Sequence, residues 1–171
     1  CAQPSLHLDR SAAATAHWLM GIGVDPASTL LLNPLPLAHV SGLMPWWRSR
    51  CWGAGHQQLA PGLMKTPTEL LAFCQGLPAW EMNPAVLSLV PTQLARLLAH
   101  PDGVAFLQQL QLIWIGGAAL PPPLADQARA LQLHLSPCYG STETAAMVAA
   151  LPTARFLAVE QGCGDPLLYV E

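Results

Sequence analysis

Charged residues are scarce in this 171-residue sequence: only 10% of them are Asp, Glu, Lys or Arg, against about 25% in an ordinary soluble domain. The seven basic residues are scattered along the chain, and the net charge is −3. No basic stripe can therefore neutralise successive phosphates, and we expect no nucleic-acid partner. The length suits one domain, or a large piece of one, with a real hydrophobic core.

Paired cysteines are also missing. The five cysteines are Cys1, Cys51, Cys74, Cys138 and Cys163, and no two of them form a CxxC pair. Such wide spacing indicates neither a disulfide framework nor a structural zinc site. We therefore expect a protein of the reducing cytoplasm.

An uninterrupted apolar helix long enough for a membrane is absent too. No charged residue occurs between Asp25 and Arg48, but this stretch contains Asn33, His39, Ser41 and four prolines. Each proline removes a backbone hydrogen-bond donor, which a spanning helix tolerates poorly. We expect no membrane span.

Short apolar runs alternate with helical patterns along the chain. Helices are predicted at residues 11–20, 42–52, 66–75, 91–100 and 121–131. Strands are predicted at residues 29–32, 85–90 and 112–115, and a further apolar segment, 133–136, leads into a loop at Tyr139. Thr66 and Glu69 have the spacing of a capping box at the start of the third helix. Continuously apolar strands between helices predict a three-layer α/β fold with a mostly parallel sheet flanked by helices.

In such sheets, ligands bind at loops that leave the carboxyl ends of the strands. The loops that follow the predicted strands cover residues 33–41, 91–93, 116–119 and 137–144. We expect these four loops to form the functional site.

The last of these loops contains Tyr-Gly-Ser-Thr-Glu-Thr at residues 139–144. It offers a flexible glycine, three hydroxyls and the carboxylate of Glu143. Magnesium takes one or two carboxylates and shares its other positions with phosphate oxygens and water, so this loop suits a magnesium–phosphate site. The alternative is that Ser141 or Thr142 caps a following helix, with Glu143 in its first turn. The residues alone leave both readings open.

This segment resembles the YGxTE motif of the adenylate-forming ligases, which include the acyl-CoA and aryl-CoA synthetases. Residues 35–42 resemble the family's PLFHxxG loop, residues 86–94 its strand–helix junction, and residues 116–121 its GGAxLP adenine loop. The four segments occur in the family's order between residues 30 and 150. SLVPTQLxRLL and HVSGLMPWWR are similar to the o-succinylbenzoate–CoA ligases in particular.

The resemblance implies roles for the residues that match its motifs. The residues assigned to the nucleotide are Gly116, Gly117, Ala118, Tyr139, Gly140 and Thr142. Tyr139 is expected to pack on the adenine, and Gly140 to allow close approach. Thr142 is expected to hydrogen-bond the α-phosphate, and Glu143 to hold Mg²⁺.

The resemblance also assigns the acid pocket. His39, counted with Thr142 and Glu143 among the catalytic residues, is expected at its wall. Ser41 is expected near the substrate, and Arg48 is expected to bind the substrate's second carboxylate, since a guanidinium pairs with carboxylate in bidentate fashion. The alternatives are that Arg48 lies on a solvated helix face and that His39 braces its loop through one good partner. We assign the six tryptophans to core and helix packing rather than to ligand stacking.

Some parts of the family pattern have no counterpart here. We find neither the phosphate-binding loop nor the C-terminal domain with its catalytic lysine, and Lys65, the one lysine, matches neither functional lysine. We therefore expect residues 1–171 to be a fragment of the large N-terminal AMP-binding domain. The implied parent enzyme uses ATP, Mg²⁺ and CoA to activate 2-succinylbenzoate for menaquinone or phylloquinone synthesis. The alternatives are another aryl or fatty acid, or a truncated adenylate-binding domain without activity.

Overall fold

The structure, a computed structural model, describes residues 5–167. Within these residues one seven-stranded sheet has the order β2-β1-β3-β4-β5-β6-β7. Its strands are β1 (Leu30–Asn33), β2 (Gly55–Gln58), β3 (Ala85–Leu89), β4 (Leu112–Ile115), β5 (Leu135–Ser141), β6 (Ala146–Ala150) and β7 (Asp165–Pro166). The strands from β2 to β5 are parallel, and β6 and β7 join them as an antiparallel edge.

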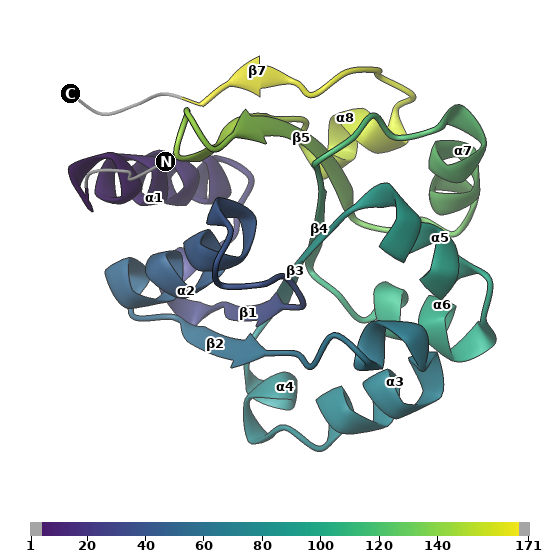
Figure 1. Cartoon of the computed structure of the whole chain (residues 1–171). Coiled ribbons are helices and arrows are strands. Elements are labelled where there is room, and N and C mark those ends of the chain that lie inside the picture. Colours follow the sequence, from purple (N-terminus) through teal and green to yellow (C-terminus); the bar gives the residue numbers. More distant parts are fainter. Residues whose placement is uncertain (1–4, 168–171) are drawn as a thin grey trace.

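Helices cover both faces of this sheet. They are α1 (Ser5–Gly21), α2 (Val40–Trp52), α3 (Pro67–Gln75), α4 (Pro78–Met82), α5 (Pro91–Leu98), α6 (Pro101–Gln108), α7 (Pro122–Ala130) and α8 (Thr153–Leu157). Figure 1 shows α1 and α2 on one side of the sheet and α3, α5, α6 and α7 on the other. The predicted three-layer α/β fold is confirmed. None of the helices within residues 5–167 is both long and apolar enough to cross a membrane.

Alternate residues of the central strands enter two different cores. Leu30 and Leu32 belong to the larger core, with residues of α3, α5, α6 and α7, whereas Leu31 belongs to the core beside α1. Side chains of a strand alternate between its faces, so a strand covered on both faces is apolar at every position. This explains why the central strands are read from the sequence as uninterrupted apolar runs.

The sequence pattern does not predict the helices α4, α6 and α8 or the strands β2, β6 and β7. The sequence of β2, Gly-His-Gln-Gln, is polar because it forms the sheet edge and has no buried residue. The predicted helix 91–100 is wrong at its end: α5 stops at Leu98, and α6 begins at Pro101. His100 is extended, with φ −132° and ψ 135°, because a residue before proline is driven out of the helical region.

The predicted capping box at α3 is also wrong. Thr66 is the N-cap residue, but its φ of −125° and ψ of 77° leave its side chain without a capping hydrogen bond. Pro67 starts the helix instead, since its fixed φ suits the first helical position. The neighbouring Thr68 hydroxyl donates to the carboxylate of Asp102, which links α3 to α6.

No helix follows the Tyr-Gly-Ser-Thr-Glu-Thr segment, so the helix-capping alternative for Ser141 and Thr142 is wrong. The chain turns back as an antiparallel hairpin in which Ser141 pairs with Ala146. The Thr144 hydroxyl oxygen accepts from the Ser141 backbone N–H at 2.9 Å and donates to the Ala146 carbonyl oxygen at 2.9 Å. The strand β5 therefore continues through Tyr139 and Gly140, which the sequence pattern places in a loop.

Gly140 is required by this hairpin itself. A Cβ atom at Gly140 would lie 1.9 Å from the Ala146 carbonyl oxygen, at the point where the register between β5 and β6 shifts. We expect Gly140→Ala to force the two strands apart and to lower the free energy of unfolding by about 3 kcal/mol. Urea denaturation of the 171-residue chain measures this loss.

Gly62 provides the matched control for that substitution. It has helical φ and ψ of −62° and −38°, and a Cβ atom there would meet nothing within 4 Å. Gly62→Ala should leave stability unchanged or raise it by about 0.5 kcal/mol, because alanine restricts the unfolded chain. Equal urea midpoints for the two variants would contradict the close approach at Gly140.

Candidate functional site

A cavity of about 360 Å³ lies at the carboxyl ends of β1, β3, β4 and β5. The predicted site residues that line it are His39, Ser41, Arg48, Gly116, Gly117, Tyr139, Gly140 and Thr142. Arg48 lies on α2, and the other seven come from three of the four predicted loops. The fourth, residues 91–93, forms the first turn of α5 and does not line the cavity, whereas the preceding Ser88, Leu89 and Val90 do. Residues far apart in the sequence thus meet in one site.

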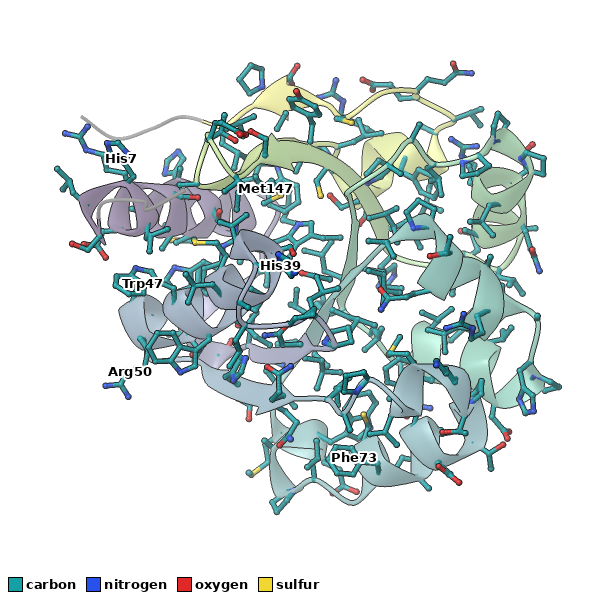
Figure 2. All side chains as sticks on the ribbon, viewed as in Figure 1. His7, His39, Trp47, Arg50, Phe73 and Met147 are labelled. Atoms are coloured by element: carbon teal, nitrogen blue, oxygen red, sulfur yellow. The ribbon has the colours of Figure 1, made fainter. Side chains whose placement is uncertain are left out.

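Arg48 forms the charged part of the cavity wall. Its side chain is buried, with 4% of the residue exposed, and its guanidinium carbon lies 5.2 Å from the centroid of the Trp114 ring. Arg50, two residues later on α2, is exposed, and Figure 2 shows it at the periphery. The solvated-face alternative is therefore wrong for Arg48 and describes Arg50.

His39 lies at the start of α2 and is exposed, with the cavity beside it. It is the N-cap residue, but its side chain makes no capping hydrogen bond. Figure 2 shows His39 and Met147, which comes from β6; both line the cavity.

Asn33, at the end of β1, braces the loop that carries His39. It is fully buried, its Oδ1 accepts from the Leu35 N–H at 3.1 Å, and its Nδ2 donates to the Gly42 carbonyl oxygen at 2.8 Å. Nδ2 also donates to Oε1 of Gln58 at 3.0 Å. Nε2 of His56 lies 3.3 Å from Nδ2, and burial lowers the pKa of His56, which favours its neutral form. One side chain thus joins β1, β2, α2 and the loop.

The two glycines after β4 shape the other side of the cavity. Gly117 has a φ of +79°, which favours glycine. A Cβ atom at Gly116 would lie 3.0 Å from the Cys138 sulfur, so the loop after β4 runs close to β5. Tyr139 is 62% exposed beside it, available for stacking. Ala118, although adjacent, does not line the cavity.

Glu143 lies exposed in the turn between β5 and β6. Hydrogen bonds from its own backbone N–H and from the Ser141 hydroxyl lower the pKa of its carboxyl below the ordinary value. The carboxylate is therefore charged at neutral pH. Glu143 itself does not line the cavity, but its neighbour Thr142 does. Residues 5–167 contain no group of three or more acidic, His or Cys side chains placed to hold a metal. A single carboxylate fits Mg²⁺ that takes its other ligands from phosphate and water.

Eleven further residues line the cavity without being among the predicted site residues, and they include Met44, Ser88, Trp114, Cys138 and Met147. Ser88 gives a signal in retrospect, because it is a lone polar residue in an apolar strand. Trp114 packs in the core, as predicted, with its ring 6.3 Å from that of Trp18, but it also lines the cavity. Burial raises the pKa of Cys138 to about 12, so its thiol stays protonated.

The site therefore combines glycines, hydroxyls and a charged carboxylate at one side with a buried guanidinium at another. The carboxyl edge of a parallel sheet is where open α/β folds bind their ligands. The family model described as AMP-binding enzyme matches residues 7–171, and the chain belongs to this family. The membership predicted from the sequence motifs is confirmed.

Curated proteins similar to this chain include 2-succinylbenzoate–CoA ligases. The chain is 35% identical over 119 residues to the 2-succinylbenzoate–CoA ligase of Escherichia coli (strain K12), which covers 70% of this chain and 23% of that protein. It is 32% identical over 147 residues to the 2-succinylbenzoate–CoA ligase of Salmonella typhimurium, covering 85% and 28%. The chain thus spans between a fifth and a third of the length of these relatives.

Solved structures show the same fold. Wild-type E. coli MenE, with a bound m-phenylether-linked analogue of OSB-AMS, has a TM-score of 0.65 and 30% identity, over 92% of this chain and 31% of that one. O-succinylbenzoate coenzyme A synthetase from Bacillus subtilis, in complex with ATP and magnesium ion, has a TM-score of 0.70, over 94% of this chain and 31% of that one. Its identity is 22%, so this second likeness is one of fold alone.

Proposed function

We propose that the chain is the acid- and adenylate-binding part of a 2-succinylbenzoate–CoA ligase. The observation that carries this proposal is one cavity lined by the buried Arg48, by Gly116 and Gly117, and by Thr142. The relatives that bear this name support it, as does the E. coli structure with an OSB-AMS analogue. The remaining parts of the reaction, the phosphate-binding loop and the lysine-bearing domain, are assigned to sequence outside these 171 residues.

The proposed reaction begins with activation of the acid. A carboxylate oxygen of the acid bonds to the α-phosphorus of ATP while the bond to pyrophosphate breaks. The Thr142 hydroxyl donates to an α-phosphate oxygen, where negative charge develops, and Tyr139 packs on the adenine beside Gly116, Gly117 and Ala118. Glu143 would hold Mg²⁺, which when bound offsets phosphate charge.

The acid itself is held by the other wall of the cavity. The guanidinium of Arg48 pairs with the carboxylate that is not activated, and His39 and Ser41 border the reacting end. The CoA thiol then attacks the acyl carbon and AMP leaves. We place this ligase in the cytoplasm, on the route to menaquinone or phylloquinone. The free thiols of Cys51, Cys74, Cys138 and Cys163 suit a reducing compartment.

Pyrophosphate exchange by the full-length protein that contains this chain tests the proposal. We expect ATP to incorporate labelled pyrophosphate when 2-succinylbenzoate is present. With 4-oxo-4-phenylbutanoate, which lacks the ring carboxylate, the specificity for exchange should fall about 100-fold, because a charge-assisted pair is lost. Exchange that responds to fatty acids, but not to 2-succinylbenzoate, would exclude the proposed acid while keeping the class.

A further inference from the structure

The guanidinium of Arg48 lies over the ring of Trp114 in a cation–π contact. Both residues are buried, with 3% and 4% of their surfaces exposed, and the guanidinium carbon lies 5.2 Å from the ring centroid. A charge removed from water needs compensation from its surroundings. The face of an indole is the most favourable aromatic surface for a cation.

Trp114 is itself held in place on β4. Its strand neighbours, Ser88 on β3 and Ser136 on β5, are directly opposite in the ladder, and their small side chains leave room for the indole. On the α1 side, the Trp18 ring packs at 6.3 Å with an angle of 45° between the planes. The ring that contacts Arg48 therefore belongs to a strand of the hydrophobic core rather than to a loop.

We infer that Trp114 is a specificity-determining residue of the acid pocket, acting by positioning Arg48 for acids that carry a second anionic group. This inference rests on the proposed function, since it assigns the ligand of Arg48 to the acid. A guanidinium can lie over an aromatic ring and still donate from its N–H edge to a carboxylate. An acid without the second carboxylate does not pair with Arg48, so its affinity does not depend on the contact between Arg48 and Trp114. Trp114 therefore affects the choice between acids rather than binding in general.

The test uses two ligands that differ only in this carboxylate. They are the sulfamoyl-adenosine analogues of the acyl-adenylates of 2-succinylbenzoate and of 4-oxo-4-phenylbutanoate, titrated calorimetrically into the full-length protein that contains this chain. Trp114→Leu should raise the Kd of the first ligand about 30-fold, or about 2 kcal/mol at 1.4 kcal/mol per tenfold change. The Kd of the second should change less than about threefold, and Trp114→Phe should lie between wild type and Trp114→Leu for the first ligand.

Replacing Trp114 can weaken binding simply by disturbing the packing of the core, and a series of fluorinated tryptophans avoids this. Tryptophan with an increasing number of ring fluorines, incorporated at position 114 alone, weakens the ring's attraction for a cation while nearly preserving its shape. The Kd of the dianionic ligand should rise step by step with each fluorine, and that of the monoanionic ligand should not. Trp52 is the control: it packs against the same core, donates from Nε1 to the Ala12 carbonyl oxygen at 3.0 Å, and does not line the cavity.

Different outcomes would contradict the role of Trp114, the role of Arg48 and the proposed function. A flat fluorine series at position 114, with wild-type protein still preferring the dianionic ligand, overturns the role of Trp114 and leaves the ligase assignment standing. Equal binding of both ligands by the wild-type protein overturns the role of Arg48. Binding of neither ligand overturns the proposed function itself.

Discussion

Replacing Glu143 by glutamine is expected to slow acyl-adenylate formation by about 1,000-fold, because a neutral amide cannot hold the magnesium ion that offsets phosphate charge. The side chains have nearly the same shape, and Glu143 is exposed in a turn, so the fold should not change. Because its hydrogen bonds keep the pKa of Glu143 below the ordinary value, the loss should be constant across the neutral pH range. Pyrophosphate exchange by the full-length protein measures it.

Glu69→Gln is the matched control for that experiment. Glu69 is also exposed, but it lies on α3, on the other side of the sheet from α1 and α2. Its substitution should leave exchange within about twofold of wild type, as expected of a surface change that touches no feature of the site. If Glu143→Gln behaved like this control, Glu143 would have to be removed from the site.

Arg48→Met should raise the Kd of the dianionic acyl-adenylate analogue by about 1,000-fold, equal to about 4 kcal/mol, because the buried carboxylate of the ligand loses its partner. Methionine keeps much of the length and the apolar stem of arginine, and removing a buried charge entirely is often tolerated by a fold. Calorimetric titration of the full-length protein with the dianionic and monoanionic analogues distinguishes loss of carboxylate recognition from a general loss of binding.

Arg50→Met, on the exposed face of the same helix, is the control and should bind both analogues like the wild-type protein. The monoanionic analogue should bind Arg48→Met within about threefold of the wild-type value, since it has no second carboxylate to lose a partner. An equal loss for both analogues would show that Arg48 supports the shape of the cavity and does not select the acid.

The central sheet can be predicted from sequence because burial on both faces leaves a local signal. The strands β1, β3 and β4 are apolar runs that end at Asn33, at Pro91 and at the glycine pair. The edge strand β2 has no such signal, since its polar residues resemble a loop. The hairpin after Tyr139 is missed for a different reason: serine and threonine followed by glutamate suit a helix N-terminus as well as a turn, and only the pairing with β6 decides between them.

The direction in which a side chain points also cannot be predicted from the local sequence, and this limits the prediction of the site. Arg48 and Arg50 are two residues apart on a helix, so they lie on different faces, and nothing local says which one points inward. Trp114 shows a second limit. An aromatic residue in an apolar strand predicts packing, which is confirmed, but the same ring also lines the cavity. Only the fold, which places the Arg48 guanidinium over this ring, reveals that second role.

The bonds of Asn33 have a thermodynamic consequence for the acid wall of the site. Its side chain fixes both ends of the segment from Leu35 to Gly42, while Gln58 of the neighbouring strand holds it from the side. A wall tied to the sheet in this way is preorganised, so the proposed acid would bind without ordering a mobile segment. Selectivity at this wall is therefore expected to be that of a fixed shape rather than of a segment that orders around its ligand.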